Sequence, residues 1–439
     1  MLGWLLKHLG FEVQLLRTSV LSDHVELVLK TSLVSNCFVA IILFLYLITT
    51  LYSIGYLTFE RDKHKVRFHS FIALSSLMAI GLAYSANLFT AFIFYDLLSV
   101  CTYMLVKHHG DENSEQHALT YAYYLLIPSM IFLLPAVILI YNFAGHTNFI
   151  VGGVLGGIPI SQLMINILFF MCIYGISKTA IYPLHKWLIH AMVAPSPVSA
   201  LLHAVLVVKG GLFLMYKVIN ETFGLEFLRQ NIYSFNGVYW PELLAGASII
   251  LAAVSAIASD NIKQRLAYST ISQIGYVSLC MFCFTDASMT AAKMQFVAHS
   301  FAKINLFFYA GYLMARYHAT TVSELKFTRN RLPVVLSIMW LVPAISLMSM
   351  PITLGFLSKH SMVHGLITGL NFASIANLFV LVAGMFLCIA YLYPLIFHML
   401  SFTTTPNRKR TGQFWSTFLV YLSVFIVSAC TVGLGVVLR

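Results

Sequence analysis

Twelve long apolar runs, separated by short polar loops, most limit what this 439-residue chain can fold into. Charged residues make up 9% of the chain and hydrophobic residues 59%, whereas soluble domains average about 25% charge. Only helices and closed barrels satisfy their backbone hydrogen bonds in lipid. Because the alternating strands of about ten residues that build barrels are absent from the sequence, we predict an all-α polytopic membrane protein and exclude a soluble enzyme.

The predicted spans each approach or exceed the length of about 20 residues that a membrane helix needs. We expect helices at 33–57, 68–86, 88–106, 118–142, 161–193, 198–218, 241–259, 265–284, 289–316, 332–368, 372–400 and 413–438. Straight helices over 161–193 and 332–368 would measure roughly 50 and 55 Å at about 1.5 Å per residue. Proline removes a helical hydrogen bond, and Pro183 interrupts the first run while Pro343 and Pro351 interrupt the second. We therefore expect both helices to be discontinuous.

The basic residues favour one side of the membrane. When the loops are assigned alternately to the two sides from residue 58, fourteen Lys and Arg, Lys263 and Arg265 among them, fall on one side and five on the other. Cytoplasmic loops carry the excess of Lys and Arg in most membrane proteins. We therefore expect a bacterial inner (cell) membrane protein with both termini extracytoplasmic and residues 1–32 as an extracytoplasmic segment. The net charge of +11 then reflects topology, and no nucleic acid is expected as a partner.

Two blocks of spans, 68–218 and 241–400, repeat the same order of helices, and the fourth span of each is the discontinuous one. Each block has five spans, so the second block would enter the membrane from the opposite side. Many secondary transporters have such an inverted repeat, with broken helices at the ion path. We expect the two blocks to form two half-channels, flanked by a peripheral helix at 33–57 and a C-terminal helix at 413–438.

Lysines inside the predicted spans are the candidates for chemistry, because a charge in lipid is costly unless it faces a polar interior. Lys178 lies at the break made by Pro183, and Lys359 lies in the second broken helix. Snorkelling to the membrane interface is the alternative for Lys178. Lys209 and Lys303 complete the set of candidate lysines.

Asp96 is the one acidic residue that we assign to a span. A pair at about 4 Å, with an effective dielectric constant near 20, is worth roughly 4 kcal/mol. We expect an Asp96–Lys178 pair to form and break, and so to switch the lysine between holding and releasing a proton. A structural salt bridge is the alternative interpretation.

Two histidines extend this set. His299 and Lys303 are four residues apart and share a helix face, whereas His203 and Lys209 are six apart and point in different directions. His203 is either a relay group or a satisfied core histidine.

The cysteines do not indicate a metal or redox site. All seven lie in apolar runs, and the CxxC of Cys280 and Cys283 has no second pair nearby, which favours inert membrane cysteines. No flavin, Fe–S or nucleotide motif is present, so we expect no cofactor and no metal bound by this chain.

Several motifs, in the same order, resemble the antiporter-like family, which comprises the large proton-channel subunits of respiratory complex I, their relatives in membrane hydrogenases, and Mrp-type multisubunit Na⁺/H⁺ antiporters. The resemblance rests on four segments within roughly residues 60 to 400, namely 178–209, 260–276, 299–303 and 355–359. The chain departs from the family at His190, where aspartate is usual, and at Asp96, where glutamate is usual. From the resemblance, we also expect two N-terminal spans of the family to be missing from this sequence.

The resemblance implies a role for each candidate residue. Asp96 takes the place of the family's carboxylate and Lys178 that of the central lysine in the first half-channel, with His203 and Lys209 as its relay. His299 and Lys303 resemble the link into the second half, and Lys359 resembles its terminal proton-bearing group.

The resemblance also implies a proton-translocating subunit of a multisubunit complex, whose partners are other membrane subunits and whose ion is H⁺, with Na⁺ as an alternative. We favour coupling to NADH–quinone oxidoreductase electron transfer, in which the electrons would pass through partner subunits. The alternatives are a subunit of an Mrp-type cation/proton antiporter and a membrane scaffold of an inorganic-carbon uptake complex.

Overall fold

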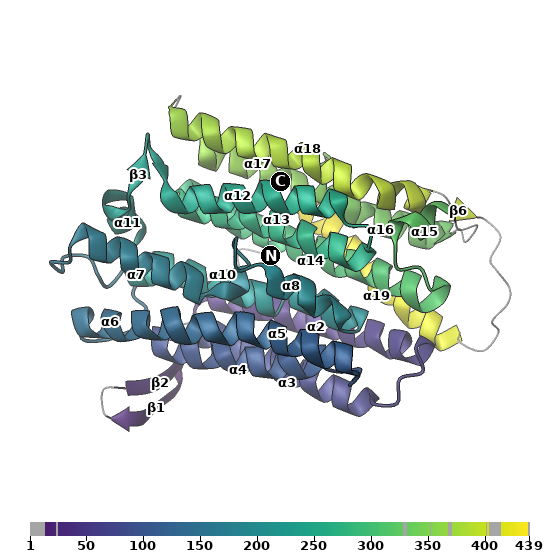
Figure 1. Cartoon of the computed structure of the whole chain (residues 1–439), viewed down its shortest axis with the longest axis horizontal. Coiled ribbons are helices and arrows are strands. Elements are labelled where there is room, and N and C mark those ends of the chain that lie inside the picture. Colours follow the sequence, from purple (N-terminus) through teal and green to yellow (C-terminus); the bar gives the residue numbers. More distant parts are fainter. Residues whose placement is uncertain are drawn as a thin grey trace.

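Long helices lying side by side form most of the molecule (Figure 1). The computed structural model describes residues 14–22, 25–327, 332–351, 353–367, 371–400, 402–403 and 414–437. The purple and blue helices of the first half occupy the lower part of the view, and the green helices of the second half occupy the upper part.

The first half contains two strands and a series of helices. Its elements are β1 (Gln14–Ser22), β2 (Val25–Lys30), α2 (Leu33–Phe59), α3 (Lys65–Tyr84), α4 (Leu88–Val106), α5 (Glu112–Pro128), η1 (Ser129–Leu133), α6 (Leu134–Ala144), α7 (Gln162–Gly175), η2 (Ser177–Thr179), α8 (Lys186–His190), η3 (Ala191–Val193), α9 (Ser196–Ala204), α10 (Val207–Lys217) and η4 (Val218–Phe223).

The second half is also mainly helical. Its elements are α11 (Leu225–Asn231), β3 (Ser234–Phe235), β4 (Val238–Tyr239), α12 (Trp240–Ala258), α13 (Ile262–Phe282), α14 (Asp286–Tyr317), α15 (Val322–Phe327), β5 (Leu332–Pro333), α16 (Val334–Leu347), α17 (Leu354–Leu366), α18 (Phe372–Leu400), β6 (Phe402–Thr403) and α19 (Phe414–Val437).

Within the described residues, eight helices are long and apolar enough to cross a membrane, against twelve predicted spans. The four other predicted spans are helical but fail one of these two criteria. The run 161–193 divides into α7, η2, α8 and η3, and the run 332–368 divides into α16 and α17. Helices α13 and α14 are long enough, but they are not apolar enough because they carry many polar side chains. Many of these side chains are buried in the interior of the bundle.

The predicted N-terminal segment 1–32 contains a feature that the sequence analysis did not predict. Strands β1 and β2 pair as an antiparallel hairpin, while residues 1–13 lie outside the described part of the chain. The hairpin is fixed to the start of α4, where the Asn87 side chain donates to Glu26 O at 2.9 Å and Val28 N donates to Thr90 Oγ1 at 3.0 Å.

Both long runs are interrupted where prolines were predicted to break them. Pro183 lies in the break between α7, which ends at Gly175, and α8, and Pro351 lies in the break between α16 and α17. Pro343 does not interrupt the second run, because α16 continues through it to Leu347. Gly355 in α17 makes the second break compact, since a Cβ atom there would lie 1.8 Å from Ser346 O of α16.

A third interruption, between α9 and α10, falls inside the predicted span 198–218 and was not expected. Val205 N and Leu206 N both donate to Leu201 O, at 3.0 and 2.9 Å. This shared acceptor breaks the regular hydrogen-bond ladder of the helix. His203 and Lys209 are thereby placed on either side of the break.

Loops gather at the two ends of the bundle (Figure 1). At one end, His108 Nε2 contacts Asp62 Oδ2 at 2.9 Å, and Ser323 Oγ donates to Asp260 Oδ1 at 2.9 Å. The hairpins β1–β2 and β3–β4 lie at the opposite end (Figure 1). The basic residues Arg329, Arg331 and 408–410 lie outside the described residues, and the cytoplasmic assignment of the first end stays a prediction.

Candidate functional site

Lys178 occupies η2, in the break between α7 and α8, and is fully buried. Its Nζ donates to Tyr95 O at 2.6 Å and lies 3.1 Å from the centroid of the Tyr95 ring. The Tyr95 hydroxyl also accepts a hydrogen bond from Lys178 N at 3.0 Å. Tyr95 of α4 therefore contacts both the backbone nitrogen and the side-chain nitrogen of Lys178. The burial of Lys178 argues against snorkelling to the membrane interface.

Asp96 follows Tyr95 in α4 and is also buried. Its Oδ1 accepts a hydrogen bond from Ser129 Oγ at 2.7 Å, whereas Oδ2 has no hydrogen-bond partner in the described part of the chain. The ion pairs among the described residues do not include Asp96 or Lys178. The predicted pair is therefore not formed in this structure, and switching through it stays a prediction.

His203, Lys209 and His299 lie near the middle of the bundle and are fully buried. Within the described ranges, none of their side-chain nitrogens has a hydrogen-bond partner. The His203 ring centroid is 4.6 Å from that of Phe307. Buried polar groups are nearly always hydrogen-bonded to protein or water, so these nitrogens are suited to bind water and exchange protons.

Helix α10 connects Lys209 with Lys178. A Cβ atom on Gly211 would lie 2.7 Å from Lys178 Cβ, so α10 packs directly against the turn that carries Lys178. Lys209, two residues earlier on α10, points toward α14, where its Nζ lies 4.4 Å from the centroid of the Phe296 ring. The structure thus brings these two lysines onto neighbouring elements.

Lys303 and His299 lie one turn apart on α14, as their spacing predicts. Lys303 Nζ donates to Ser269 Oγ and, at 3.0 Å, to Leu266 O, both on α13. His299 and Lys359 line one small internal gap between α14 and α17. The predicted residues of the second half are therefore neighbours in space.

Lys359 is buried, and its Nζ lies 2.9 Å from the centroid of the Tyr276 ring on α13. In the part of the chain that the structure describes, this Nζ has no hydrogen-bond partner. Cation–π contacts are worth about 2 kcal/mol or more when desolvated. The Tyr276 ring therefore offsets part of the cost of a charge on Lys359.

A chain of neutral polar side chains beside Lys359 was missed in the sequence. Gln295 Nε2 donates to Gln273 Oε1 at 2.8 Å, Gln273 Nε2 donates to the Tyr391 hydroxyl at 3.2 Å, and Ser358 Oγ donates to Gln295 Oε1 at 2.6 Å. Gln273 and Gln295, two glutamines inside apolar runs, were the sequence signal for this network.

Three charged residues correct the sequence analysis. Glu242 lies in the first turn of α12 and is buried, so the prediction that Asp96 is the one acid within a span is wrong. Lys263 and Arg265 were assigned to a loop, but both are buried in α13. Their charges are compensated by backbone carbonyls, since Lys263 Nζ donates to Ala194 O and Arg265 donates to Tyr391 O.

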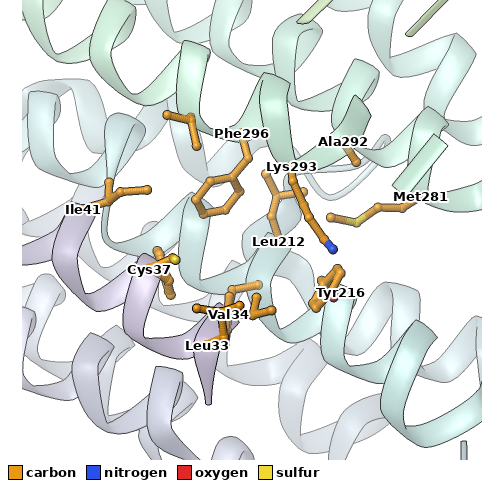
Figure 2. Close-up of a pocket in the computed structure, with 13 residues that line it drawn as sticks. Leu33, Val34, Cys37, Ile41, Leu212, Tyr216, Met281, Ala292, Lys293 and Phe296 are labelled. Carbon is orange, nitrogen blue, oxygen red and sulfur yellow. The ribbon is translucent and has the colours of Figure 1, made fainter. Parts of the chain in front are cut away.

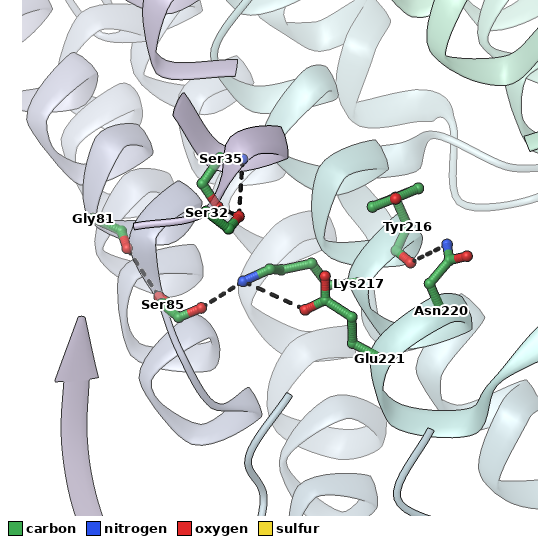
Figure 3. A network of polar contacts seen from close by, with 8 residues as sticks. All are labelled: Ser32, Ser35, Gly81, Ser85, Tyr216, Lys217, Asn220 and Glu221. Carbon is green, nitrogen blue, oxygen red and sulfur yellow. Dashed lines mark hydrogen bonds and ion pairs between the residues drawn. The ribbon is translucent and has the colours of Figure 1, made fainter. Parts of the chain in front are cut away.

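Lys217 belongs to a separate polar cluster at the end of α10 (Figure 3). Its Nζ donates to Ser85 O at 2.6 Å and lies 3.7 Å from Glu221 Oε2. These contacts join the end of α10 to the end of α3, which indicates a structural role.

An apolar pocket of about 350 Å³ lies among α2, α10, α13 and α14 (Figure 2). Lys293 is the one charged residue among those that line it. Phe296 lines the pocket, and its ring also contacts Lys209 Nζ. This ring separates the pocket from the buried lysine.

The fold is that of a polytopic helical membrane protein whose broken helices enclose buried lysines and histidines. A family model described as NADH:quinone oxidoreductase/Mrp antiporter, transmembrane, matches residues 85–387. The chain belongs to this family and is a multi-pass integral membrane protein.

Curated relatives match over much of this chain. NADH-quinone oxidoreductase subunit L of Buchnera aphidicola is 30% identical over 378 residues, which cover 81% of this chain and 58% of the relative. NAD(P)H-quinone oxidoreductase chain 5 of Synechocystis is 29% identical over 66% of this chain and 41% of its own length. The chloroplastic subunit 5 of Piper cenocladum is 30% identical over 61% of this chain and 36% of its own length. The chain thus spans about a third to three-fifths of the length of these relatives.

Solved structures share the fold. The Mrp complex of a Dietzia species matches with a TM-score of 0.76 and 23% identity, over 98% of this chain and 46% of that chain. The membrane-bound sulfane sulfur reductase, an archaeal respiratory membrane complex, matches with a TM-score of 0.81 and 19% identity, over 99% of this chain and 86% of that chain.

Proposed function

We propose that this chain moves protons across the membrane as one subunit of a multisubunit complex. One observation carries the proposal. Four lysines, namely Lys178, Lys209, Lys303 and Lys359, are buried across the bundle, and none of them forms an ion pair among the described residues. Intramembrane ionisable residues are costly and mark ion and proton paths.

The proposed path begins at Asp96 and Lys178. While the Asp96 carboxylate lies close to the Lys178 ammonium, the pair stabilises the charge, and when the two separate the proton moves on. Tyr95 O holds the Lys178 Nζ in the separated state. The next groups are Lys209 and His203, which lie across the α9–α10 break.

The second part of the path runs from His299 and Lys303 to Lys359. His299 and Lys359 line the same internal gap, which is too small for a water molecule in this structure, so proton transfer between them requires the gap to widen and admit water. We propose that the two blocks, 68–218 and 241–400, are inverted half-channels. In each block a central lysine lies over a tyrosine ring, Lys178 over Tyr95 and Lys359 over Tyr276. This shared contact supports the repeat.

We favour coupling to quinone reduction by partner subunits. The curated relatives named above are subunits of quinone oxidoreductases, and this chain has no cofactor motif of its own. A gradient-driven Mrp-type antiporter is the second candidate, supported by the match of 98% of this chain to the fold of an Mrp complex subunit.

Potential-driven proton uptake tests the proposal. The native complex is purified and reconstituted into vesicles, a potassium diffusion potential is imposed, and the internal pH is recorded with a dye. Lys178→Ala is expected to abolish uptake while the complex still assembles. Lys186→Ala, an exposed lysine of the same broken run, is the matched control and should leave uptake unchanged.

Uptake at the wild-type rate by Lys178→Ala vesicles would remove this lysine from the path. Absorbance of the purified complex distinguishes the two forms of coupling. Flavin and Fe–S spectra support the redox-driven complex, whereas their absence supports the antiporter.

A further inference from the structure

Glu242 is a buried carboxylate that the proposed path does not use. It lies in the first turn of α12 and is 4% exposed. Its Oε2 accepts a hydrogen bond from Asn377 Nδ2 of α18 at 3.0 Å. An acid in the first turn also interacts favourably with the helix dipole, so a purely structural role is the alternative to be tested.

Glu242 lies at a specific end of the bundle. Helix α12 begins next to β4, at the end that carries the two hairpins (Figure 1). By the distribution of basic residues, this end is predicted to be extracytoplasmic. A carboxylate here is placed where protons that have crossed the second half would leave.

One face of α13 leads from Lys359 toward Glu242. Tyr276, Cys280 and Cys283 are spaced i, i+4 and i+7, which places them on one side of the helix. Lys359 Nζ lies over the Tyr276 ring at one end of this face, and Cys283 Sγ lies 3.8 Å from Asn377 Nδ2 at the other. Seven residues of helix correspond to about 10 Å.

Helix α18 covers the same face. A Cβ atom on Gly384 would lie 2.3 Å from the Tyr276 hydroxyl, and Asn377, two turns away on α18, holds Glu242. The Tyr276 hydroxyl has no hydrogen-bond partner among the described residues. Cys280, between the two ends, is within electrostatic range of both Lys359 and Glu242.

We propose that Glu242 accepts the proton that leaves Lys359 and releases it at the hairpin end of the bundle. The proton passes along the Tyr276–Cys283 face, which α18 covers closely in this structure, so its passage requires water to enter between α13 and α18. Lys359 becomes a neutral amine and Glu242 a carboxylic acid, which then gives the proton to bulk water. Asn377 orients the carboxylate through its hydrogen bond. This inference rests on the proposed function and adds its release site.

The test replaces the carboxyl group while keeping its shape. Glu242→Gln retains an oxygen for Asn377 but cannot carry a proton, and we expect potential-driven uptake in vesicles of the native complex to fall roughly a hundredfold. Glu226→Gln, at an exposed carboxylate of the same end that pairs with Arg229, is the matched control and should keep the wild-type rate. Wild-type uptake by Glu242→Gln would overturn the inference.

A spectroscopic readout excludes a merely structural role. The infrared difference on acidification between the wild-type complex and Glu242→Gln should contain the band of one protonated carboxyl group. If Glu242→Gln does not assemble, Glu242→Asp is used instead. This variant should assemble, shift the band and slow uptake, and an unchanged band and rate would reject the release site.

Lys359→Ala, measured in the same vesicles, separates the two proposals. Loss of uptake in Lys359→Ala together with wild-type uptake in Glu242→Gln rejects only the release site. Wild-type uptake in Lys178→Ala and Lys359→Ala rejects the proposed function and the release site with it.

Discussion

The two halves of the molecule each place a central lysine over a tyrosine ring but differ in the residue that follows that tyrosine. Lys178 Nζ lies 3.1 Å from the Tyr95 ring centroid, and Lys359 Nζ lies 2.9 Å from that of Tyr276. Asp96 follows Tyr95, whereas Val277 follows Tyr276. The first half therefore places an acid next to its tyrosine, and the second half does not.

In the second half, neutral amides take over the polar role. Gln273 and Gln295 form a chain of hydrogen bonds beside Lys359. A neutral hydrogen bond contributes about 1 kcal/mol, compared with roughly 4 kcal/mol for a charge pair at 4 Å. We infer that Asp96 can strongly change the charge on Lys178 in the first half. The charge on Lys359 in the second half then follows the change in the first half.

Removal of either central lysine should have the largest effect. If the halves form one continuous path, Lys178→Ala and Lys359→Ala each reduce proton uptake by about a thousandfold or more, because each interrupts the path. If the halves conduct independently, Lys359→Ala vesicles would keep about half of the wild-type rate, as measured by the internal pH dye.

Exchange of the acid between the halves should have the next largest effect. Asp96→Asn is expected to slow uptake about tenfold, which corresponds to a loss of roughly 1.4 kcal/mol of coupling. Adding Val277→Asp to this variant should not restore the rate, since the second lysine would then be held by a permanent partner. An unaltered rate in Asp96→Asn would mean that the acid is structural.

Disruption of the amide chain should have a smaller effect. Gln295→Leu removes the hydrogen bonds with Gln273 and Ser358, and uptake is expected to fall about fivefold, for a cost of about 1 kcal/mol. Gln230→Leu, at an exposed glutamine of α11, is the control for a surface change. A fall as large as that of Asp96→Asn would contradict the difference between the halves.

The smallest effect should be on stability and should separate the two tyrosines. Tyr95→Phe removes the hydroxyl that binds Lys178 N, at a cost of about 1 kcal/mol. The Tyr276 hydroxyl has no hydrogen-bond partner among the described residues, so Tyr276→Phe should cost less. Thermal melting of the purified complex measures the loss of stability in both variants. Equal losses in Tyr95→Phe and Tyr276→Phe would contradict the difference in hydrogen bonding between the two hydroxyls.

The positions of most membrane helices and of the buried lysines were predictable from the sequence, because long apolar runs with few charges have few structural alternatives. Lys178 and Lys359 stood out as charges within such runs. The α9–α10 break was not predictable, since no proline or glycine marks Val205 or Leu206. Its cause is a shared backbone acceptor, which depends on tertiary packing.

The hydrogen-bond partners of the buried charged side chains could also not be predicted from the sequence. Asp96 follows Tyr95, whose ring contacts Lys178, yet Asp96 Oδ1 accepts a hydrogen bond from Ser129 Oγ and Lys178 Nζ donates to Tyr95 O instead. The burial of Glu242 could not be predicted because this residue lies near the end of a span, where hydropathy alone does not separate a solvated acid from a buried one.

The ring of Phe296 has a consequence for electrical insulation. It forms part of the wall of the pocket, in which Lys293 is the one charged lining residue (Figure 2). The same ring contacts Lys209 Nζ, which lies 4.4 Å from its centroid. A single aromatic side chain thus serves as the dielectric barrier between the pocket and a buried charge. The Phe296 ring must therefore stay in place for the protein to prevent lateral leakage of ions between Lys209 and the pocket.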